Sequence, residues 1–207
     1  MPAGGPNPNA WHNWYHCVGS TYGTWLRGDP RGFRTFRHRE HVEGDYRKPP
    51  PAGVWEPVFA ERKAKLSHPP VVLDDAQRDC LCRAMVERLM SDEVDAVVLA
   101  VASNHFHLLA RFPKLEAADL KRLNSVTLSD GRDPAPRHYL GRARRHASFA
   151  LSAAGLKPAS QVWADRPKCE PIRDRGHQVN AARYIQGHAK QGAAVWMLGR
   201  GFLFEGT

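Results

Sequence analysis

The sequence VDAVVLAVASNHFHLLARF (Val94–Phe112) contains two apolar runs, and the rest of the predicted fold can be built around them. Val94–Ala102 is apolar apart from Asp95, and a second run extends from His105 to Phe112. Runs of this length, rich in aliphatic residues, are typical of strands in a protein core. Only Ser103 and Asn104 separate the two runs, which is enough for a tight turn. The sequence therefore predicts a β-hairpin.

Amphipathic helices are predicted on both sides of this hairpin. The segment LDDAQRDCLCRAMVERLMSDE (73–93) has Asp74 or Asp75 as its N-cap. Its apolar residues recur at a spacing of three or four, at Cys82, Met85, Val86, Leu89 and Met90. LEAADLKRLNSVTL (115–128) and HYLGRARRHASFALSAAGL (138–156) also have helical patterns, the latter except at Gly141. HQVNAARYIQGHAKQG (177–192) predicts a final helix that Gly192 stops.

The remaining segments predict two further strands and an insertion. WYHCVGSTYGT (14–24) predicts a first strand that ends at Gly23, and QVWADRPKCEPIRD (161–174) a short, irregular one. Residues 1–10 are rich in Pro, Gly and Asn, which predicts a disordered tail. Residues 25–72 are rich in Pro and Arg and predict an irregular insertion, because so long a segment is not a plain loop.

This order of elements predicts the fold class. Strand, insertion, helix, two strands, two helices, strand and helix suit an α+β fold, a ferredoxin-like (RRM-like) antiparallel sheet backed by helices. With 207 residues we expect a single domain over 11–207 that includes the insertion. The longest apolar run is less than half of a membrane helix, so we expect a cytoplasmic protein with no membrane contact. The four cysteines form no C-x-x-C pair and are expected to be reduced thiols.

His105 and His107 are unusual in a core strand. Alternate side chains of a strand share a face, so the two imidazoles point to one side and Phe106 and Leu108 to the other. The pair is either a polar outer face or the beginning of a divalent metal site. A third ligand would favour the metal site, and His188 is the best candidate, since it lies one helical turn after Tyr184.

Tyr184 would then lie beside whatever the metal binds. A tyrosine hydroxyl, with an ordinary pKa of about 10, is a weak nucleophile and needs a polarised electrophile such as a metal-bound phosphodiester. The alternative is an aromatic side chain that packs on the sheet. Among the other tyrosines, Tyr15, Tyr22, Tyr46 and Tyr139, only Tyr139 also falls in a predicted helix, without a ligand-type residue one turn later.

SNHFHLLARF (103–112) resembles the "pNHfHLL" signature of single-tyrosine HUH transposases of the insertion-sequence and REP-associated types. VWADRPKCEPIRD and ARYIQGHAKQGA resemble the C-terminal block of that family, and YHCVGSTYGTWLRGDPRGFR its first strand and following loop. The resemblance touches roughly residues 14–196. Two departures are visible. The third ligand is usually Gln or Asn, where this chain has His188, and Ala102-Ser103 stands in place of the usual Met-Pro.

The resemblance implies a DNA endonuclease and transposase. His105, His107 and His188 would hold Mg²⁺ or Mn²⁺, and Tyr184 would attack single-stranded DNA, forming a 5′-phosphotyrosine link and leaving a free 3′-hydroxyl. The implied partner is single-stranded DNA that carries hairpin element ends. In insertion-sequence relatives the tyrosine helix can act in trans within a homodimer, whereas REP-associated relatives resemble monomers, so the oligomeric state stays open.

The basic character of the chain fits a nucleic-acid partner. The formal net charge is +9, which favours a polyanion. The predicted phosphate contacts are Lys121, Arg122, Arg142, Arg144 and Arg145. Near the last three the sequence shows His146 and no acid; the alternative is a solvated basic helix face. In the insertion, Arg31, Arg34, Arg37 and Arg39 alternate with Phe33 and Phe36, a mixture that grips single strands or anchors a surface flap.

Two other functions remain open at this stage. One is a catalytically inactive, domesticated protein that binds DNA hairpins. The other is a zinc hydrolase built on the three histidines with water as the fourth ligand, for which the sequence offers no clear general base.

Overall fold

The computed structural model describes residues 11–29, 53–122, 133–158 and 161–203. These residues form two compact units. The first contains the β-sheet and the helices that cover it. The second comprises the described residues of 20–72 and 158–165, and thus the whole described part of the predicted insertion.

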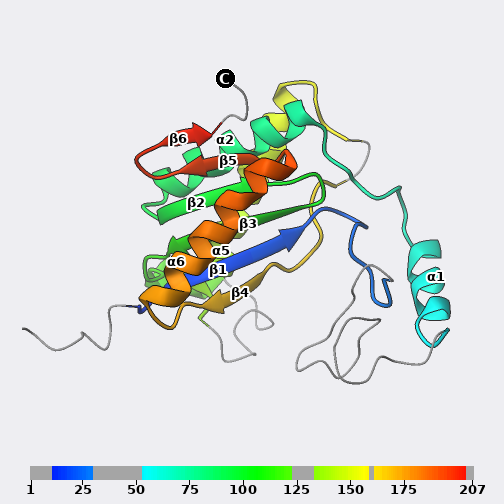
Figure 1. Cartoon of the computed structure of the whole chain (residues 1–207), viewed down its shortest axis with the longest axis horizontal. Coiled ribbons are helices and arrows are strands. Elements are labelled where there is room, and N and C mark those ends of the chain that lie inside the picture. Colours follow the sequence, from blue (N-terminus) through cyan, green and yellow to red (C-terminus); the bar gives the residue numbers. More distant parts are fainter. Residues whose placement is uncertain (1–10, 30–52, 123–132, 159–160, 204–207) are drawn as a thin grey trace, which may run out of the picture. The chain divides into compact units, whose positions relative to one another are not determined.

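The first unit is built on a six-stranded antiparallel sheet (Figure 1). Its strands are β1 (Trp14–Ser20), β2 (Asp95–Val101), β3 (His105–Arg111), β4 (Lys168–Pro171), β5 (Ala194–Met197) and β6 (Gly201–Leu203), in the order β4-β1-β3-β2-β5-β6. The predicted hairpin is confirmed. Val101 pairs with Phe106, and the amide of Ala102 donates to the carbonyl of His105 at 2.8 Å, so the turn lies at Ser103 and Asn104.

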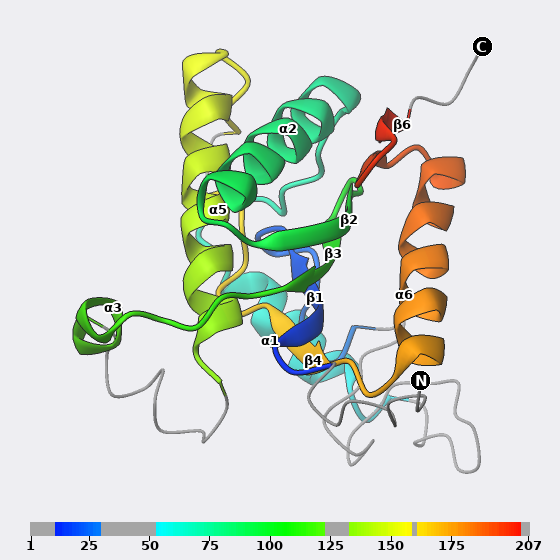
Figure 2. The same cartoon turned by 90° about the vertical axis from the view of Figure 1, so that its left-hand side faces the viewer.

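Helices cover both faces of this sheet. Figure 2 shows α2 (Asp75–Ser91) and α5 (Ala135–Ala153) on one side and α6 (Arg175–Gly187) on the other. The elements β1, α2, β2, β3, α5 and β4 follow one another in the predicted βαββαβ order, and their strands lie in the order β4-β1-β3-β2. The structure is therefore α+β with a sheet backed by helices, as predicted.

Helix α2 begins at a capping box. The amide of Gln77 donates to Asp74 Oδ1 at 2.8 Å, and the amide of Asp74 donates to Gln77 Oε1 at 3.0 Å, so two amides at the helix start are satisfied. The predicted apolar stripe is buried at Cys82, Met85, Val86 and Leu89. The prediction was wrong for Met90, which is 59% exposed, because one further residue turns the side chain by about 100° towards solvent.

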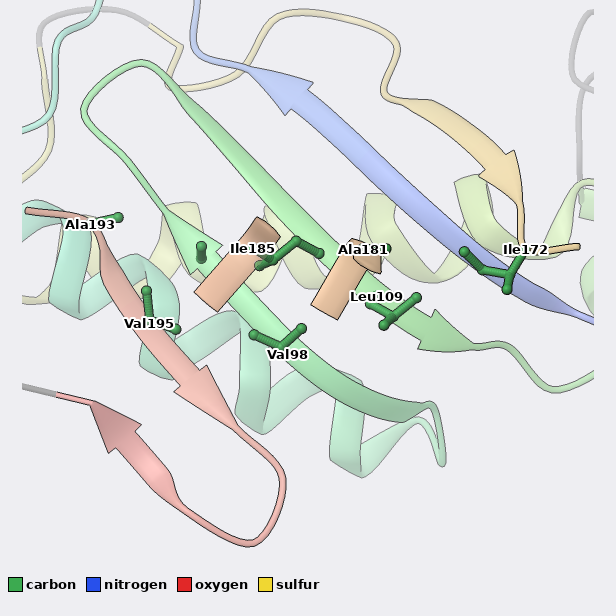
Figure 3. Close-up of a cluster of buried hydrophobic side chains, with 8 residues drawn as sticks. Val98, Leu109, Ile172, Ala181, Ile185, Ala193 and Val195 are labelled. Atoms are coloured by element: carbon green, nitrogen blue, oxygen red, sulfur yellow. The ribbon is translucent and has the colours of Figure 1, made fainter. Parts of the chain in front are cut away.

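The core between α6 and the sheet places the helix on the histidine face. Ala181 and Ile185 of α6 pack over Val98 of β2 and Leu109 of β3 (Figure 3). Leu109 has the same strand parity as His105 and His107, so all three point to the α6 side. Phe106 and Leu108, which are fully buried, point to the α2 and α5 side.

The end of the chain differs from the prediction. The final helix ends at Gly187 and continues as a 3₁₀ turn, η2 (His188–Gln191), which Gly192 terminates in the left-handed conformation at φ 76°. Strands β5 and β6 then follow, whereas the sequence pattern predicted no strand after this helix. Strand β5 has only four residues, too few for a clear alternation pattern, and its position is fixed by pairing with β2.

The other elements also depart from their predicted bounds. Strand β1 ends at Ser20 rather than Gly23, which lies in a turn with φ 68°. Of the helix predicted over 115–128, the described part is α3 (Ala117–Arg122), and 123–132 lie outside the described residues. Helix α5 begins earlier than predicted, at Ala135, and includes Gly141. The predicted disordered tail 1–10 also lies outside the described residues.

The second unit contains a helix where the sequence predicted irregular chain. Helix α1 (Glu56–Ala64) has Pro57 in its first turn, where the missing amide proton breaks no helical hydrogen bond. The prolines of this segment therefore mark a helix start as well as loops. Gly28, at φ 83°, passes so close to α1 that a Cβ there would lie 2.7 Å from the carbonyl oxygen of Trp55.

Among the described residues, none of the helices has both the length and the apolar composition needed to cross a bilayer.

Candidate metal centre

Three histidines from two elements meet on the α6 face of the sheet. His105 and His107 belong to β3 and His188 is the first residue of η2. One ring nitrogen from each lies within 4.8 Å of the others. The rings of His107 and His188 are stacked with centroids 4.7 Å apart, and that of His105 lies edge-on to both, at 4.9 and 5.3 Å. As the sequence predicted, a histidine at the end of a late helix lies beside His105 and His107.

The position of His188 follows from the way α6 is held. The side chain of Asp174 caps the helix start by accepting from the amide of His177 at 2.8 Å. Ala181 and Ile185 pack on the sheet, and His188 follows Ile185 by three residues, which keeps it on the same side of the helix. The 3₁₀ turn and Gly192 then lead the chain into β5.

The three imidazoles are held in the neutral form by their surroundings. His107 and His188 are each only 6% exposed. Burial lowers the pKa of His107 to about 3, with further lowering by its neighbours His105 and His16. Burial is also the main cause that lowers the pKa of His105 and of His188, and for His188 the Gln191 side chain acts in the opposite direction. Neutral imidazole is the form that binds metal ions.

The hydrogen-bond inventory of the histidines fits a metal ion. Neither ring nitrogen of His188 has a hydrogen-bond partner of acceptable geometry within the described residues, although both are buried. Buried polar atoms are normally paired, and a pair of unpaired nitrogens in a core calls for an explanation. Because three imidazole nitrogens converge here, this group could hold a divalent metal ion.

Tyr184 lies at the solvent side of the group. Its side chain is 56% exposed, and its ring stands edge-on to those of His188 and His107, with centroids 5.0 and 5.2 Å away. The alternative of an aromatic side chain that packs on the sheet is met only in part, because the ring contacts His107 of β3 but is more than half exposed. The phenol is therefore accessible to solvent beside the three histidines.

His16 is a member of the site that the sequence analysis missed. It lies on β1, next to β3, and its Nε2 is 3.0 Å from Nδ1 of His107. Its ring centroid is 6.3 Å from that of Tyr184. The alternation of side chains along a strand also applies to WYHCVGS, where it places His16 on the opposite face from Tyr15 and Cys17. What the sequence could not supply was the strand order, which makes β1 the neighbour of β3.

The predicted phosphate contacts lie elsewhere. Arg142, Arg144 and Arg145 belong to α5, which covers the opposite face of the sheet from α6 (Figure 2). Lys121 lies on α3, on the α5 side in the same view, and the side chain of Arg122 lies outside the described residues. The structure therefore does not bring these residues together with the three histidines.

The surroundings of the arginines on α5 also differ from the sequence picture of a basic group without acids. Helix α2 and its C-cap residue supply two acidic neighbours. Arg142 forms an ion pair with Asp92 at 2.8 Å, and His146 lies 3.5 Å from Glu87. The nearest acids are distant in sequence and come close only through helix packing. Arg145 is exposed.

Two of the competing tyrosines have partners of their own within the first unit, and the other two lie in the second unit or outside the described residues. Tyr139 of α5 stacks on Phe112 with centroids 6.3 Å apart, and the hydroxyl of Tyr15 donates to Asp133 Oδ2 at 3.3 Å. Tyr22 belongs to the second unit. Tyr46 lies outside the described residues, as do Arg31, Phe33, Arg34, Phe36, Arg37 and Arg39 of the insertion.

Comparison with models of protein families, with curated proteins and with solved structures finds no match to this chain.

Proposed function

We propose that this protein is a metal-dependent enzyme that nicks and rejoins single-stranded DNA through a covalent link to Tyr184. The observation that carries the proposal is the exposed tyrosine, whose ring stands 5.0 and 5.2 Å from two members of a group of three converging histidines. The resemblance of SNHFHLLARF and ARYIQGHAKQGA to the HUH transposases supports the same assignment.

The metal ligands in this proposal are His105, His107 and His188. When bound, Mg²⁺ or Mn²⁺ supplies a Lewis acid that polarises a phosphoryl oxygen of the substrate. Three neutral nitrogen donors suit Mn²⁺ better than Mg²⁺, which prefers oxygen ligands. We therefore expect the enzyme to be more active with Mn²⁺ than with Mg²⁺ at equal concentration.

The tyrosine performs the bond exchange. Tyr184 Oη attacks the scissile phosphorus in line with the 3′-oxygen, so a tyrosine O–P bond forms as the P–O3′ bond breaks. The phenol proton passes to solvent and the released 3′-oxygen takes up a proton. The product is a 5′-phosphotyrosine and a free 3′-hydroxyl. Attack by a DNA 3′-hydroxyl reverses the step without ATP, because one phosphoester bond replaces another.

The α6 side offers cations for the DNA backbone. Arg183 precedes Tyr184 and is exposed, and Lys190 is exposed on η2. Phosphate contacts by such side chains make the affinity fall with salt concentration. A single strand that approaches Tyr184 would therefore meet positive charge on the same helix.

The test is a pair of tyrosine variants. Tyr184→Phe removes the proposed nucleophile at an exposed position, and Tyr139→Phe makes the same change on α5, away from the histidines. Each protein is incubated with a labelled single-stranded hairpin oligonucleotide and MnCl₂, and covalent adducts are resolved on a denaturing gel. We expect Y184F to lose the adduct while it binds the oligonucleotide as the wild type does, and Y139F to keep both.

Adducts that persist in Y184F would contradict the assignment of Tyr184, and wild-type binding without any adduct would favour the inactive hairpin-binding protein. A zinc hydrolase is the second candidate, because three imidazoles are a common catalytic zinc set. Metal analysis of the purified protein separates the two enzymes: the zinc enzyme would carry one tightly held zinc ion, and Y184F would leave its hydrolysis intact.

A further inference from the structure

His105 and His107 of β3 each use one ring nitrogen, Nδ1, in a hydrogen bond. Each makes one hydrogen bond to a neighbour that comes from outside the three-histidine group, namely Asn104 for His105 and His16 for His107. In a neutral imidazole one nitrogen carries the proton and the other carries the lone pair. A hydrogen bond at one nitrogen therefore decides what the other can offer a metal ion.

Asn104 settles the question for His105. Nδ1 of His105 is 2.6 Å from Oδ1 of Asn104. An amide oxygen only accepts, so Nδ1 of His105 donates and carries the proton. Nε2 of His105 then presents its lone pair.

The contact between His16 and His107 has two forms. If Nδ1 of His107 donates to Nε2 of His16, the lone pair of His107 lies on Nε2 and is available to a metal ion. If His16 donates instead, the proton of neutral His107 lies on Nε2 and its only lone pair is already engaged. The 3.0 Å contact thus makes metal binding by His107 depend on whether His16 accepts.

We propose that His16 is a positioning residue of the metal centre: by accepting a hydrogen bond from Nδ1 of His107, it fixes the ring and the tautomer in which Nε2 of His107 binds the ion. Asn104 does the same for His105 from the β2–β3 turn. This inference rests on the metal centre of the proposed function and is independent of the DNA chemistry. Partners of this kind orient metal-binding histidines and raise their basicity.

The fold gives His16 a fixed place for this role. Strand β1 lies between β3 and β4, and His16 is in register with Glu170 of β4. Its ring lies 5.2 Å from the ring of His107 with planes inclined by 30°. Because β1 lies between two paired strands, the backbone of His16 is held beside β3, and the hydrogen bond links its ring to that of His107.

The first experiment measures Mn²⁺ affinity by titration calorimetry. His16→Gln keeps a side-chain oxygen that can accept, whereas His16→Phe keeps a ring and removes the acceptor. We expect H16F to bind Mn²⁺ about 10- to 100-fold more weakly than the wild type and H16Q to recover most of that loss. His12→Phe, at an exposed histidine in the turn before β1, is the matched control and should bind as the wild type does.

An affinity of H16F equal to that of the wild type would overturn the proposal, because binding would then not need an acceptor at this position. A loss in H16Q as large as in H16F would also overturn it, because restoring an acceptor would not restore binding. Circular dichroism spectra establish that each variant is folded.

The second experiment needs neither metal nor DNA. Two-bond ¹H–¹⁵N spectra of the metal-free wild type report which nitrogen of each histidine carries the proton. We expect the Nδ1–H form for both His105 and His107, and a mixture of forms for His107 in H16F. An Nε2–H form of His107 in the wild type would overturn the proposal even if the protein bound Mn²⁺. Conversely, an Nδ1–H form in a wild type that bound no Mn²⁺ would leave the hydrogen bond established and the Mn²⁺ centre of the proposed function refuted.

Discussion

The imidazole of His188 lies ring on ring with that of His107, at a centroid distance of 4.7 Å and an interplanar angle of 22°, although one belongs to a strand and the other to the end of a helix on the far side of the sequence. His105 of β3 also faces His188, edge-on at a centroid distance of 5.3 Å, so two ring contacts link η2 to β3. A ligand that bridges these histidines would join the end of the last helix to the central sheet.

A bound metal ion should stabilise the folded protein. At a free Mn²⁺ concentration of 100 times the dissociation constant, one site that exists only in the folded state adds about 2.7 kcal/mol to the free energy of unfolding. We expect MnCl₂ to raise the thermal midpoint and EDTA to reverse the change. His188→Ala should abolish the shift, whereas His146→Ala on α5 should leave it intact. A shift of equal size in H188A would place the binding elsewhere.

The packing of α6 should govern both stability and metal affinity. Ile185 is fully buried against the sheet, so Ile185→Ala should cost about 2–5 kcal/mol of unfolding free energy. Because Ile185 lies three residues before His188, the variant should also bind Mn²⁺ more weakly. Leu198→Ala, at a side chain that is 63% exposed, should change stability by less than about 0.5 kcal/mol. Urea unfolding measures the stability of the two variants. Equal losses of unfolding free energy in I185A and L198A would show that Ile185 contributes nothing through burial.

Single-stranded DNA should bind on the α6 side rather than on α5. The double variant Arg183→Glu with Lys190→Glu should lower affinity for a single-stranded oligonucleotide by about tenfold and flatten its salt dependence. Arg142→Glu with Arg145→Glu changes the net charge by the same amount on the opposite face, and should weaken binding less. Fluorescence anisotropy at two or more salt concentrations provides the comparison. A larger loss of affinity in the Arg142 and Arg145 double variant would instead indicate that DNA binds at the arginines of α5, as the sequence predicted.

Tyr15 should make stability fall at alkaline pH. Burial, followed by Asp133, raises the pKa of its hydroxyl to about 12, against about 10 in an unfolded chain. The unfolded chain therefore loses this proton first, so the contribution is complete below pH 10 and is lost as the pH rises towards 12. Tyr15→Phe should reduce the loss of unfolding free energy across that range by about 1 kcal/mol, allowing for solvent screening. Tyr22→Phe should not reduce it.

Local periodicity accounts for what the sequence could predict. The two-residue alternation of HFHLL placed His105 and His107 on one face, and the four-residue spacing placed Tyr184 beside His188. These relationships depend on residues close together in sequence. The capping box of Asp74 and Gln77 is another local signal, and α2 begins where it indicated.

Contacts between distant segments account for what it could not. His16 joins His107 only because β1 and β3 are neighbours in the sheet, and Arg142 meets Asp92 only because α2 packs on α5. Strand β5 is short and owes its place to pairing with β2. The face on which α5 lies, and hence the distance of its arginines from the histidines, is likewise a property of the whole sheet.

Along the chain, the helix that carries Tyr184 lies between two strands of the same sheet. Strand β4, immediately before α6, pairs with β1, and β5, shortly after η2, pairs with β2. Both ends of the helix are therefore connected to strands that are paired within the sheet. Lending its tyrosine to the histidines of a second molecule would require β4 or β5 to leave its place, so the geometry of the sheet favours a tyrosine and a metal centre that serve the same chain.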